Sequence, residues 1–523
     1  MVQEGAGSSP VIRPVFKFLT LFRLFMFSSI FGQFISNLLP ILVFFPIISG
    51  GFLFFLSPAY YSNCRVIRFW ISSICFLFSL ALWILFDQSR NSFQFTYSIF
   101  WFSQINIEFS LGVDGISLFF IVLTSFLIPL CILASWDSVD NIPQVYFGLF
   151  LVLEGFILAV FCVTDVIAFY IFFEAVLVPI FLLIGVYGSR ERRVKAAYFF
   201  FLYTLLGSLF ILLAIQVLFF TVGSTDFLVL QDSLGLFSFE RECLLWSAFF
   251  FSFAVKVPII PAHLWLPEAH VEAPTAGSVL LAGVLLKLGS YGIVRFLVGL
   301  FPAASLYFIP GLFSLAVIAV IYTSITALRQ SDIKRVIAYA SVAHINITLV
   351  GLFSGTGLGL EGSIYQILSH GLVSGALFLC VGVIYDRYHT RVIFYYSGLA
   401  QVIPVFVAFF LFFIMANIAL PGTSSFVGEF LILVGIGQVN FLVAIIASVS
   451  IVLGGGYSLW LFNRLAFGNV TGFLGFFGDL SRREFVILFF LGSVVLFLGL
   501  FPNFILGPIH ISCASLLVHL QSV

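Results

Sequence analysis

Long apolar runs recur along the whole chain and predict its architecture. Each is about 20 residues long, the length at which an α-helix crosses a bilayer. Residues 87–113 alternate polar and aromatic positions and predict a small interfacial hairpin. The fourteen runs lie at residues 38–58, 66–86, 114–135, 143–163, 165–187, 196–221, 243–269, 275–298, 306–328, 334–354, 361–385, 402–436, 441–465 and 485–508. The pattern predicts an all-α polytopic membrane protein with about 14 transmembrane helices.

The composition agrees with this class and excludes several functions. Of 523 residues, 62% are hydrophobic and 8% charged, and the mean hydropathy is +1.21. Soluble domains carry about 25% charged residues. The formal net charge of zero argues against a nucleic-acid partner. The seven cysteines are scattered without a C-x-x-C motif, which excludes a disulfide framework and a cysteine-ligated cluster or zinc site.

Residues 1–36 precede the first run and differ from it. They contain Arg13, Lys17 and Arg23, several serines and a single acid, Glu4. Such a segment is typical either of a targeting sequence or of an extra helix, and both interpretations stay open.

Basic residues in the loops indicate how the chain is oriented. Loops after odd-numbered runs hold fourteen Lys and Arg, and loops after even-numbered runs hold three. This asymmetry is the positive-inside signal of a polytopic protein. Lys256 and Lys287 then remain as the two basic residues that no loop or terminus accounts for. A charge at the centre of a span costs about 3 kcal/mol, so both lysines are candidates for function.

The spans hold a small set of further ionisable side chains. Two of the spans are also interrupted, one by Pro258 and Pro261 just after its lysine, the other by Pro421. A broken helix exposes backbone polar groups at mid-depth, which is tolerated against protein or water. Acids, lysines and histidines without a nucleophile triad or phosphate loop suit proton movement. The ionisable set is Glu154, Glu174, Lys256, Lys287, His344, His370 and Glu429.

These side chains predict a relay. A Glu174–Lys256 pair that opens and closes would switch the lysine between holding and releasing a proton. The proton would pass to Lys287 and then, through water and the two histidines, to Glu429. Glu154 is a secondary member.

Each residue also has a structural interpretation. A lysine can extend to the interface, and an acid can form an ion pair or a helix-packing hydrogen bond. A histidine between helices can bridge carbonyls, and Glu154 can merely tune Glu174. For four residues near a span end, an interfacial cap is the favoured interpretation. These four are His263, Glu268, His270 and Glu272.

The two interrupted spans also indicate an internal repeat. Lys256 and Glu429 are 173 residues apart, and Glu174 and His344 are 170 apart. We infer two five-helix repeats, spans 4–8 and 9–13, inverted because the number of spans is odd; paired broken helices point to a transport site. The expected division is an extension (1–36), three spans with the hairpin (37–142), the first repeat (143–300), the second (301–466), and a last span with a tail (467–523).

Five long motifs carry a resemblance to a known family. They are FFEAVLVP, FAVKVPIIPAHLWLPEAHVEAPTAGSVLLAGVLLKLGSYG, SDIKRVIAYASVAHIN, QILSHGLVSGALFLCVGVIYDR and LPGTSSFVGEFLILVG. Together they resemble chain 4 of mitochondrial NADH:ubiquinone oxidoreductase (complex I), an antiporter-like subunit of its membrane arm, over about residues 38–510. The resemblance implies that Glu174, Lys256, Lys287, His344, His370 and Glu429 occupy the positions of the family's proton relay.

The resemblance also implies a function and its setting. We expect a proton-translocating subunit in the mitochondrial inner membrane, with chains 2 and 5, accessory subunits and lipids such as cardiolipin as neighbours. NADH, FMN, iron–sulfur clusters and ubiquinone would belong to partner subunits, with no cofactor or metal on this chain. Two alternatives remain: a subunit of a multisubunit cation/proton antiporter, and a scaffold that does not conduct.

Overall fold

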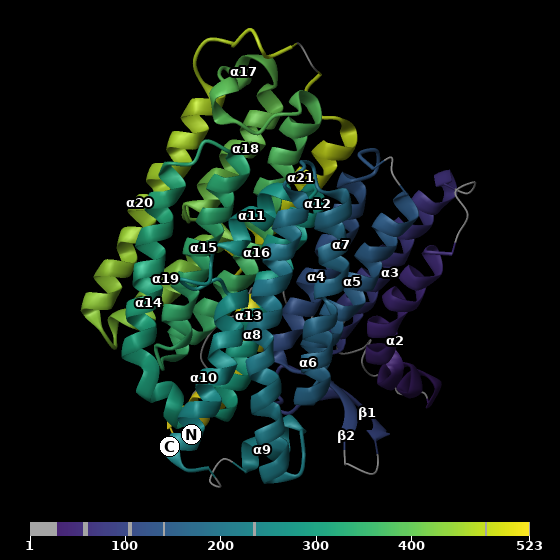
Figure 1. The fold of residues 1–523 in the computed structure, drawn as a ribbon, viewed down its shortest axis with the longest axis vertical. Coiled ribbons are helices and arrows are strands. Elements are labelled where there is room, and N and C mark those ends of the chain that lie inside the picture. The colour runs from purple at the N-terminus through teal and green to yellow at the C-terminus, as the bar shows by residue number, and fades with distance from the viewer. Residues whose placement is uncertain are drawn as a thin grey trace, which may run out of the picture.

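The computed structural model describes residues 29–55, 61–102, 107–139, 142–233, 237–475 and 478–521. Residues 1–28 of the predicted extension lie outside these ranges. Most of the helices run side by side along the long axis of the molecule (Figure 1). A short hairpin, α9 and the end of the chain lie at one end, and α17 lies at the other (Figure 1).

The first half of the chain forms the helices on one side of the bundle, with α2 and α3 at its edge (Figure 1). Its elements are α2 (Ser29–Leu53), α3 (Tyr61–Leu85), β1 (Gln94–Phe102), β2 (Ile107–Val113), α4 (Gly115–Ala134), α5 (Pro143–Cys162), α6 (Val166–Ala175), α7 (Leu177–Tyr187), α8 (Arg193–Val222), α9 (Phe227–Asp232), α10 (Phe239–Lys256), α11 (Trp265–Glu272), α12 (Thr275–Leu280), the π-helix η4 (Leu281–Leu285), α13 (Leu286–Gly292) and the π-helix η5 (Ile293–Val298).

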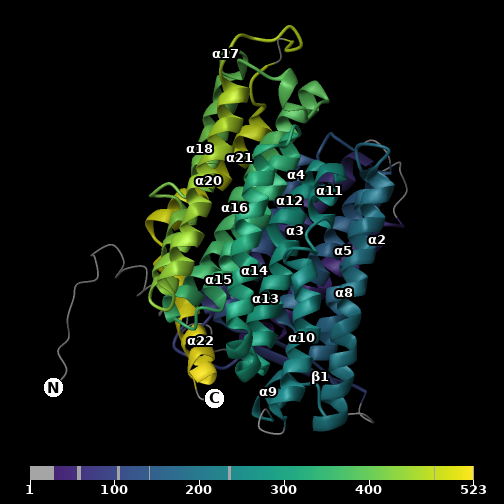
Figure 2. The same ribbon diagram turned by 60° about the vertical axis from the view of Figure 1, so that its left-hand side comes forward.

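The second half packs against this bundle and extends beyond it at the α17 end (Figure 2). Its elements are α14 (Pro302–Leu328), α15 (Ile333–Leu352), α16 (Gly357–Tyr388), the 3₁₀ turn η6 (Ile393–Tyr395), α17 (Leu399–Val402), α18 (Pro404–Asn417), α19 (Ser424–Gly437), α20 (Phe441–Ala466), α21 (Arg482–Leu500) and α22 (Asn503–Gln521).

The structure confirms the predicted hairpin. Strands β1 and β2 pair antiparallel, with Tyr97 opposite Leu111 and Ile99 opposite Phe109. Helix α4 follows directly, because Asp114 caps it: the Asp114 carboxylate accepts from the Ser117 N–H, and the Ser117 hydroxyl bonds back to the Asp114 N–H. The hairpin is thus joined rigidly to a spanning helix.

The class of all-helical polytopic membrane protein is also confirmed. Among the described residues, twelve helices are long and apolar enough to span a membrane. Three shorter apolar helices include α18 and α19, the two halves of one interrupted span. The other predicted interruption separates α10 from α11. The count of fourteen spans, the inverted repeats and the domain limits stay predictions.

The C-terminal segment differs from the prediction. We predicted one span at 485–508 and then a tail, but α21 ends at Leu500 and α22 continues to Gln521. Pro502 has no N–H to continue α21, yet a proline is tolerated just before a new helix begins. Both helices run antiparallel to α16, since Glu484 at the start of α21 bonds Arg387 near the end of α16, and His510 of α22 bonds Glu361 near its start.

Helix α16 lies at the centre of the fold, and its most apolar stretch is wholly buried. It packs against α19 most extensively, and also against α15, α12, α4, α21 and α22. Glycines permit close approach: a Cβ on Gly362 or Gly428 would lie within 2.6 Å of α19 and α16 atoms respectively. Residues on α16 can therefore contact both halves of the molecule.

The burial of several Lys and Arg side chains corrects the expectation that Lys256 and Lys287 are the two cations inside the protein. We placed Arg68, Arg295, Lys334 and Arg391 in loops, but each is at most 8% exposed. Arg295 forms an ion pair with Asp114 at 2.7 Å, and its guanidinium faces the rings of Phe93, Phe227 and Tyr291. Segments near the span ends fold inward, which distance along the sequence alone does not reveal. Lys256 and Lys287 are therefore not the only interior cations.

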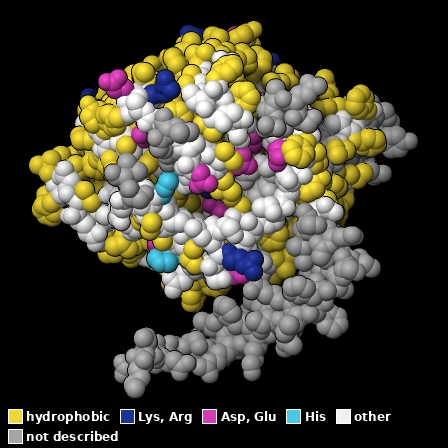
Figure 3. Space-filling view, turned by 90° about the horizontal axis from the view of Figure 1, so that it is seen from below, with side chains coloured by type: hydrophobic (Ala, Val, Ile, Leu, Met, Phe, Trp, Pro, Cys, Tyr) yellow, Lys and Arg dark blue, Asp and Glu magenta, His cyan; other side chains and the backbone are white. Residues whose placement is uncertain are grey.

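The end of the molecule that carries the hairpin is hollowed. A cavity of about 720 Å³ is lined by residues 91–93, which precede β1, and by α9, η5 and α22. The Asp114–Arg295 ion pair forms part of its wall. Acidic and histidine side chains gather near the middle of this end, with hydrophobic side chains on its flanks (Figure 3).

Candidate functional site

Lys256 is the last residue of α10, next to the predicted break. Pro258 lacks the N–H needed to continue the helix, and the chain turns until α11 begins at Trp265. The Lys256 side chain is buried, and its Nζ donates to the Phe173 carbonyl oxygen at 2.8 Å. The same Nζ lies 3.1 Å from the centroid of the Phe173 ring. The negative end of the α10 dipole favours a cation at this position.

Glu174 lies beside this contact but does not pair with the lysine. It stands two residues before Val176, where α6 gives way to α7. The predicted Glu174–Lys256 ion pair is not formed among the described residues; the lysine bonds the neighbouring backbone carbonyl instead. The Glu174 Oε1 atom is buried, with no hydrogen-bond partner among the residues that the structure describes. The acid and the lysine are adjacent, in an open arrangement.

Lys287 lies in α13, between the π-helices η4 and η5. In a π-helix the hydrogen-bond ladder shifts by one residue, and such segments are frequent at functional sites. The Lys287 Nζ donates to the carbonyl of Ala282 in η4 and lies 2.8 Å from His370 Nδ1. The side chain is 0% exposed. No hydrogen bond joins it to Lys256 in the described part of the chain.

The two predicted histidines and Glu429 extend the contact of Lys287. The His370 and His344 ring centroids are 6.0 Å apart, and His344 Nδ1 lies 2.9 Å from Glu429 Oε1. His370 Nε2 is buried without a partner. Lys287, His370, His344 and Glu429 thus form one row from η4 and α13 through α16 and α15 to α19.

Two further side chains in this row were missed by sequence reasoning. Gln366 donates from Nε2 to Glu429 Oε1 at 3.0 Å, and the Tyr457 hydroxyl lies 3.4 Å from His344 Nε2. Gln366 is one turn before His370 on α16, a spacing that could have indicated it. Tyr457, on α20, had no comparable signal.

The second interrupted helix positions Glu429. Helix α18 ends at Asn417, and α19 begins at Ser424 after a turn containing Pro421. Ala419 and Gly422 in this turn have φ of +64° and +94°, which a helix cannot contain. Glu429 is 3% exposed, in the second turn of α19. At the other break, Asn346 of α15 donates to the Pro258 carbonyl oxygen at 3.4 Å.

Glu154 lies apart from this row. It is 0% exposed in α5, and neither carboxylate oxygen has a hydrogen-bond partner in the described part of the chain. The Cys75 thiol of α3 lies within its electrostatic reach. The structure does not bring Glu154 into contact with the other candidate residues.

The four residues for which we favoured an interfacial cap behave differently from one another. Glu268 bonds Arg335 at 2.6 Å and is 42% exposed, as a cap would be. His263, His270 and Glu272 are at most 5% exposed, so the interfacial interpretation is wrong for them. His270 stacks on Phe378 with ring centroids 4.9 Å apart, and both of its nitrogens lack partners. Helix α11 is drawn into the bundle rather than lying at its surface.

The arrangement is suited to carrying protons. No group of three or more His, Cys, Asp or Glu with metal-binding geometry occurs within the described ranges. Imidazole nitrogens, an amine and a carboxylate in sequence can each accept and release a proton. The 6.0 Å between the histidine rings is the widest step in the row and requires a bridging water or ring motion.

Comparisons with known proteins agree with this geometry. The family described as "NADH:quinone oxidoreductase/Mrp antiporter, TM" matches residues 163–454, and "NADH-ubiquinone oxidoreductase chain 4, amino terminus" matches residues 43–164. NADH-ubiquinone oxidoreductase chain 4 of Marchantia polymorpha is 52% identical, covering 94% of this chain and 99% of the relative. The protein of the same name from Arabidopsis thaliana is 53% identical over 91% and 96%.

Solved structures share the fold. A chain of respiratory complex I from Thermus thermophilus matches with a TM-score of 0.83 and 30% identity, covering 92% of this chain and 99% of that one. A chain of the Mrp complex from Dietzia matches with a TM-score of 0.83 at 19% identity, over 93% and 99%, which shows the fold alone. On the family matches and the identity to these relatives, the chain belongs to the NADH-ubiquinone oxidoreductase chain 4 family.

Proposed function

We propose that this chain is a membrane-arm subunit of respiratory complex I that moves protons across the mitochondrial inner membrane. The observation that carries the proposal is the buried row Lys287–His370–His344–Glu429, with contacts of 2.8 Å and 2.9 Å at its two ends. A row that only stabilised helix packing would not need four titratable groups in succession. Family membership supports the setting, since relatives of this name are NADH-ubiquinone oxidoreductase subunits.

Each residue has a defined task in this mechanism. In the open arrangement Lys256 donates to the Phe173 carbonyl and Glu174 is not paired with it. When the Glu174 carboxylate moves onto the Lys256 amine, the ion pair stabilises the protonated lysine. When the pair separates again, the lysine releases its proton. Lys287 transfers a proton to His370 Nδ1. His370 then passes a proton from its Nε2 atom through a bridging water to His344, and His344 delivers a proton to Glu429. Gln366 and Tyr457 orient the receiving carboxylate and imidazole.

The proposal also covers the surroundings of the chain. Neighbours would be chains 2 and 5 and accessory subunits, with cardiolipin against the outer helices. NADH oxidation, FMN, the iron–sulfur clusters and ubiquinone reduction would belong to partner subunits, so the translocase activity depends on conformational or electrostatic coupling to them.

The test uses the assembled complex in closed inner-membrane vesicles. Lys287→Met removes the central amine without adding bulk, and we expect fewer protons translocated per NADH oxidised. Lys195→Met is the matched control, since Lys195 is exposed at the start of α8. Native-gel migration with the NADH dehydrogenase is measured first for both variants.

Each alternative has its own outcome. Migration as a smaller complex without NADH dehydrogenase activity would identify a subunit of a cation/proton antiporter. Normal assembly and unchanged proton translocation in Lys287→Met would refute the proposal and support a scaffold.

A further inference from the structure

A third buried lysine, Lys334, lies at the opposite end of the broken helix from Lys256. It is the second residue of α15 and 2% exposed. Its Nζ donates to the Ala273 carbonyl at 3.0 Å and to Ser278 Oγ at 3.1 Å. We propose that Lys334 is a titrating residue at the entrance of the relay, exchanging protons between a solvent-filled pocket and the interior; this rests on the proposed function.

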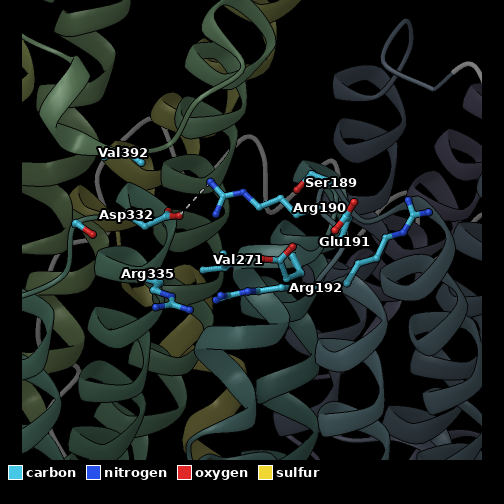
Figure 4. A pocket seen from close by; sticks show the side chains of 11 residues that line it. Ser189, Arg190, Glu191, Arg192, Val271, Asp332, Arg335 and Val392 are labelled. Atoms are coloured by element: carbon cyan, nitrogen blue, oxygen red, sulfur yellow. Dashed lines mark ion pairs between the residues drawn. The ribbon is translucent and has the colours of Figure 1, made fainter.

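The pocket lies beside Lys334, at the end of the molecule opposite the hairpin, and several arginines line it. Its volume is about 760 Å³, far more than the roughly 30 Å³ that one water occupies. Its wall comes from the α7–α8 loop, the end of α11 and the start of α15, where Arg190 reaches across to Asp332 at 4.0 Å (Figure 4). Water can therefore reach the end of α11.

Glu272 joins the pocket to Lys334. It lines the pocket, yet it is only 2% exposed, and its Oε2 atom is buried with no hydrogen-bond partner within the described ranges. It is the chain neighbour of Ala273, whose carbonyl accepts from Lys334. A carboxylate with a free oxygen between water and a buried amine is placed to pass protons between them.

His270 provides the next step inward. It is 0% exposed, neither ring nitrogen has a hydrogen-bond partner among the described residues, and the charges of Lys334 and Lys287 both act on its imidazole. Ser278, which accepts from Lys334, donates to the His270 carbonyl at 2.9 Å and so holds the two residues together. A proton route through Glu272, Lys334 and His270 would reach Lys287 without passing through Lys256.

The transfer is a sequence of proton moves in which no other bond changes. Hydronium in the pocket protonates the Glu272 carboxylate and leaves water. The Glu272 carboxyl gives this proton to the neutral Lys334 amine, and the resulting ammonium gives a proton to a nitrogen of His270. Glu272 and Lys334 then return to their starting states.

A structural role is the alternative, because cations at the C-terminal end of a helix satisfy its free carbonyls. Arg391 has this role already: buried beside Lys334, it donates to the carbonyl of Val271 in α11. An arginine stays protonated in proteins, whereas a lysine can lose its proton. Exchanging the two residue types therefore separates the roles.

The decisive variant is Lys334→Arg, which keeps the cation and its donors but cannot release a proton. We expect assembly to be retained and the protons translocated per NADH to fall, because the route from Lys334 to Lys287 is blocked. Arg391→Lys is the matched control, with a cation kept at the same helix end and no loss expected. Glu272→Gln, nearly isosteric, should lower proton translocation in the same way.

Different failures have different meanings. Normal translocation in an assembled Lys334→Arg complex, or in Glu272→Gln if the arginine variant does not assemble, would overturn the entrance role. The proposed function would still stand if Lys287→Met lost translocation in the same experiment. Normal translocation in all variants would refute both.

The pH dependence of proton translocation gives a second readout. When proton entry at Lys334 limits the rate, translocation should depend on the pH on the side of the membrane that the pocket faces. The charged groups around Lys334 that contribute to such a profile are Asp332, Glu272, Asp386, Arg391 and His270. We expect the profile to change shape in Lys334→Arg.

Discussion

Replacing Gly371 with alanine tests whether the Lys287–His370 contact depends on close packing of α16 against η4. A Cβ on Gly371 would lie 2.8 Å from the Gly283 carbonyl oxygen and 3.4 Å from Lys287 Cε. An ordinary carbon–oxygen contact is longer, so η4 or α16 must move. Helix η4 supplies the Ala282 carbonyl that accepts from Lys287 and leads directly into α13, so a movement of η4 shifts the lysine.

The size of the effect follows from this geometry. Adding a methylene to a well-packed interior costs about 1–3 kcal/mol. At about 2 kcal/mol, the arrangement in which Lys287 meets His370 loses roughly 30-fold in population, because 1.4 kcal/mol corresponds to a factor of ten. We expect proton translocation per NADH to fall while the complex still assembles.

Gly375→Ala is the matched control, one turn further along α16. The nearest atoms to its Cβ would be Val279 Cγ1 at 3.4 Å and Leu127 Cδ2 at 3.8 Å, which are ordinary contacts. Both variants gain the same helix propensity, up to about 1 kcal/mol. Translocation by assembled Gly371→Ala equal to that of Gly375→Ala would show that the relay does not need this packing.

Three further predictions follow from other contacts. Asp114→Ala should destabilise the chain by about 3–5 kcal/mol, because Arg295 is left buried and unpaired, and Arg295→Met in the same chain should restore thermal stability except for the lost cap of α4, about 1 kcal/mol. Burial raises the pKa of Asp165 from 3.8 to about 6, so the native state binds more protons there and stability falls as pH rises through this window. Asp165→Asn should therefore raise thermal stability at pH 7, by roughly 2 kcal/mol, and have little effect at pH 4. Tyr457→Phe should lower proton translocation with a stability cost of about 1 kcal/mol, whereas Tyr365→Phe, whose hydroxyl bonds a backbone carbonyl, should cost the same stability and leave translocation unchanged.

Elements that depend on local chemistry were predictable from the sequence. The hairpin followed from alternation at residues 87–113, and the end of α10 at Lys256 followed from Pro258, because a proline ring removes a hydrogen bond wherever it lies. The split of α18 from α19 followed from Pro421 and Gly422 for the same reason. The division of α21 from α22 was missed, although Pro502 carried the same signal.

Contacts between distant segments were predictable only in part. The ionisable residues within spans could be found by their cost in hydrocarbon, and the structure brings Lys287, His370, His344 and Glu429 into one row. The contact of Lys256 with the Phe173 carbonyl was not predicted, because it depends on how α6 packs against α10; the opening and closing Glu174–Lys256 pair stays a prediction.

The apolar runs, the helix breaks and the acid–lysine–histidine set were determined by the sequence itself, since each reflects the transfer of a short segment from water to lipid. Only the tertiary structure decided which of these groups meet, and that Lys334 and His270 are interior residues rather than residues of the membrane surface. The physical reason is that burial and hydrogen-bond partners depend on how α11, α15 and α16 pack together. That packing is set by contacts across more than sixty residues of sequence, such as the one between Lys334 and Ala273.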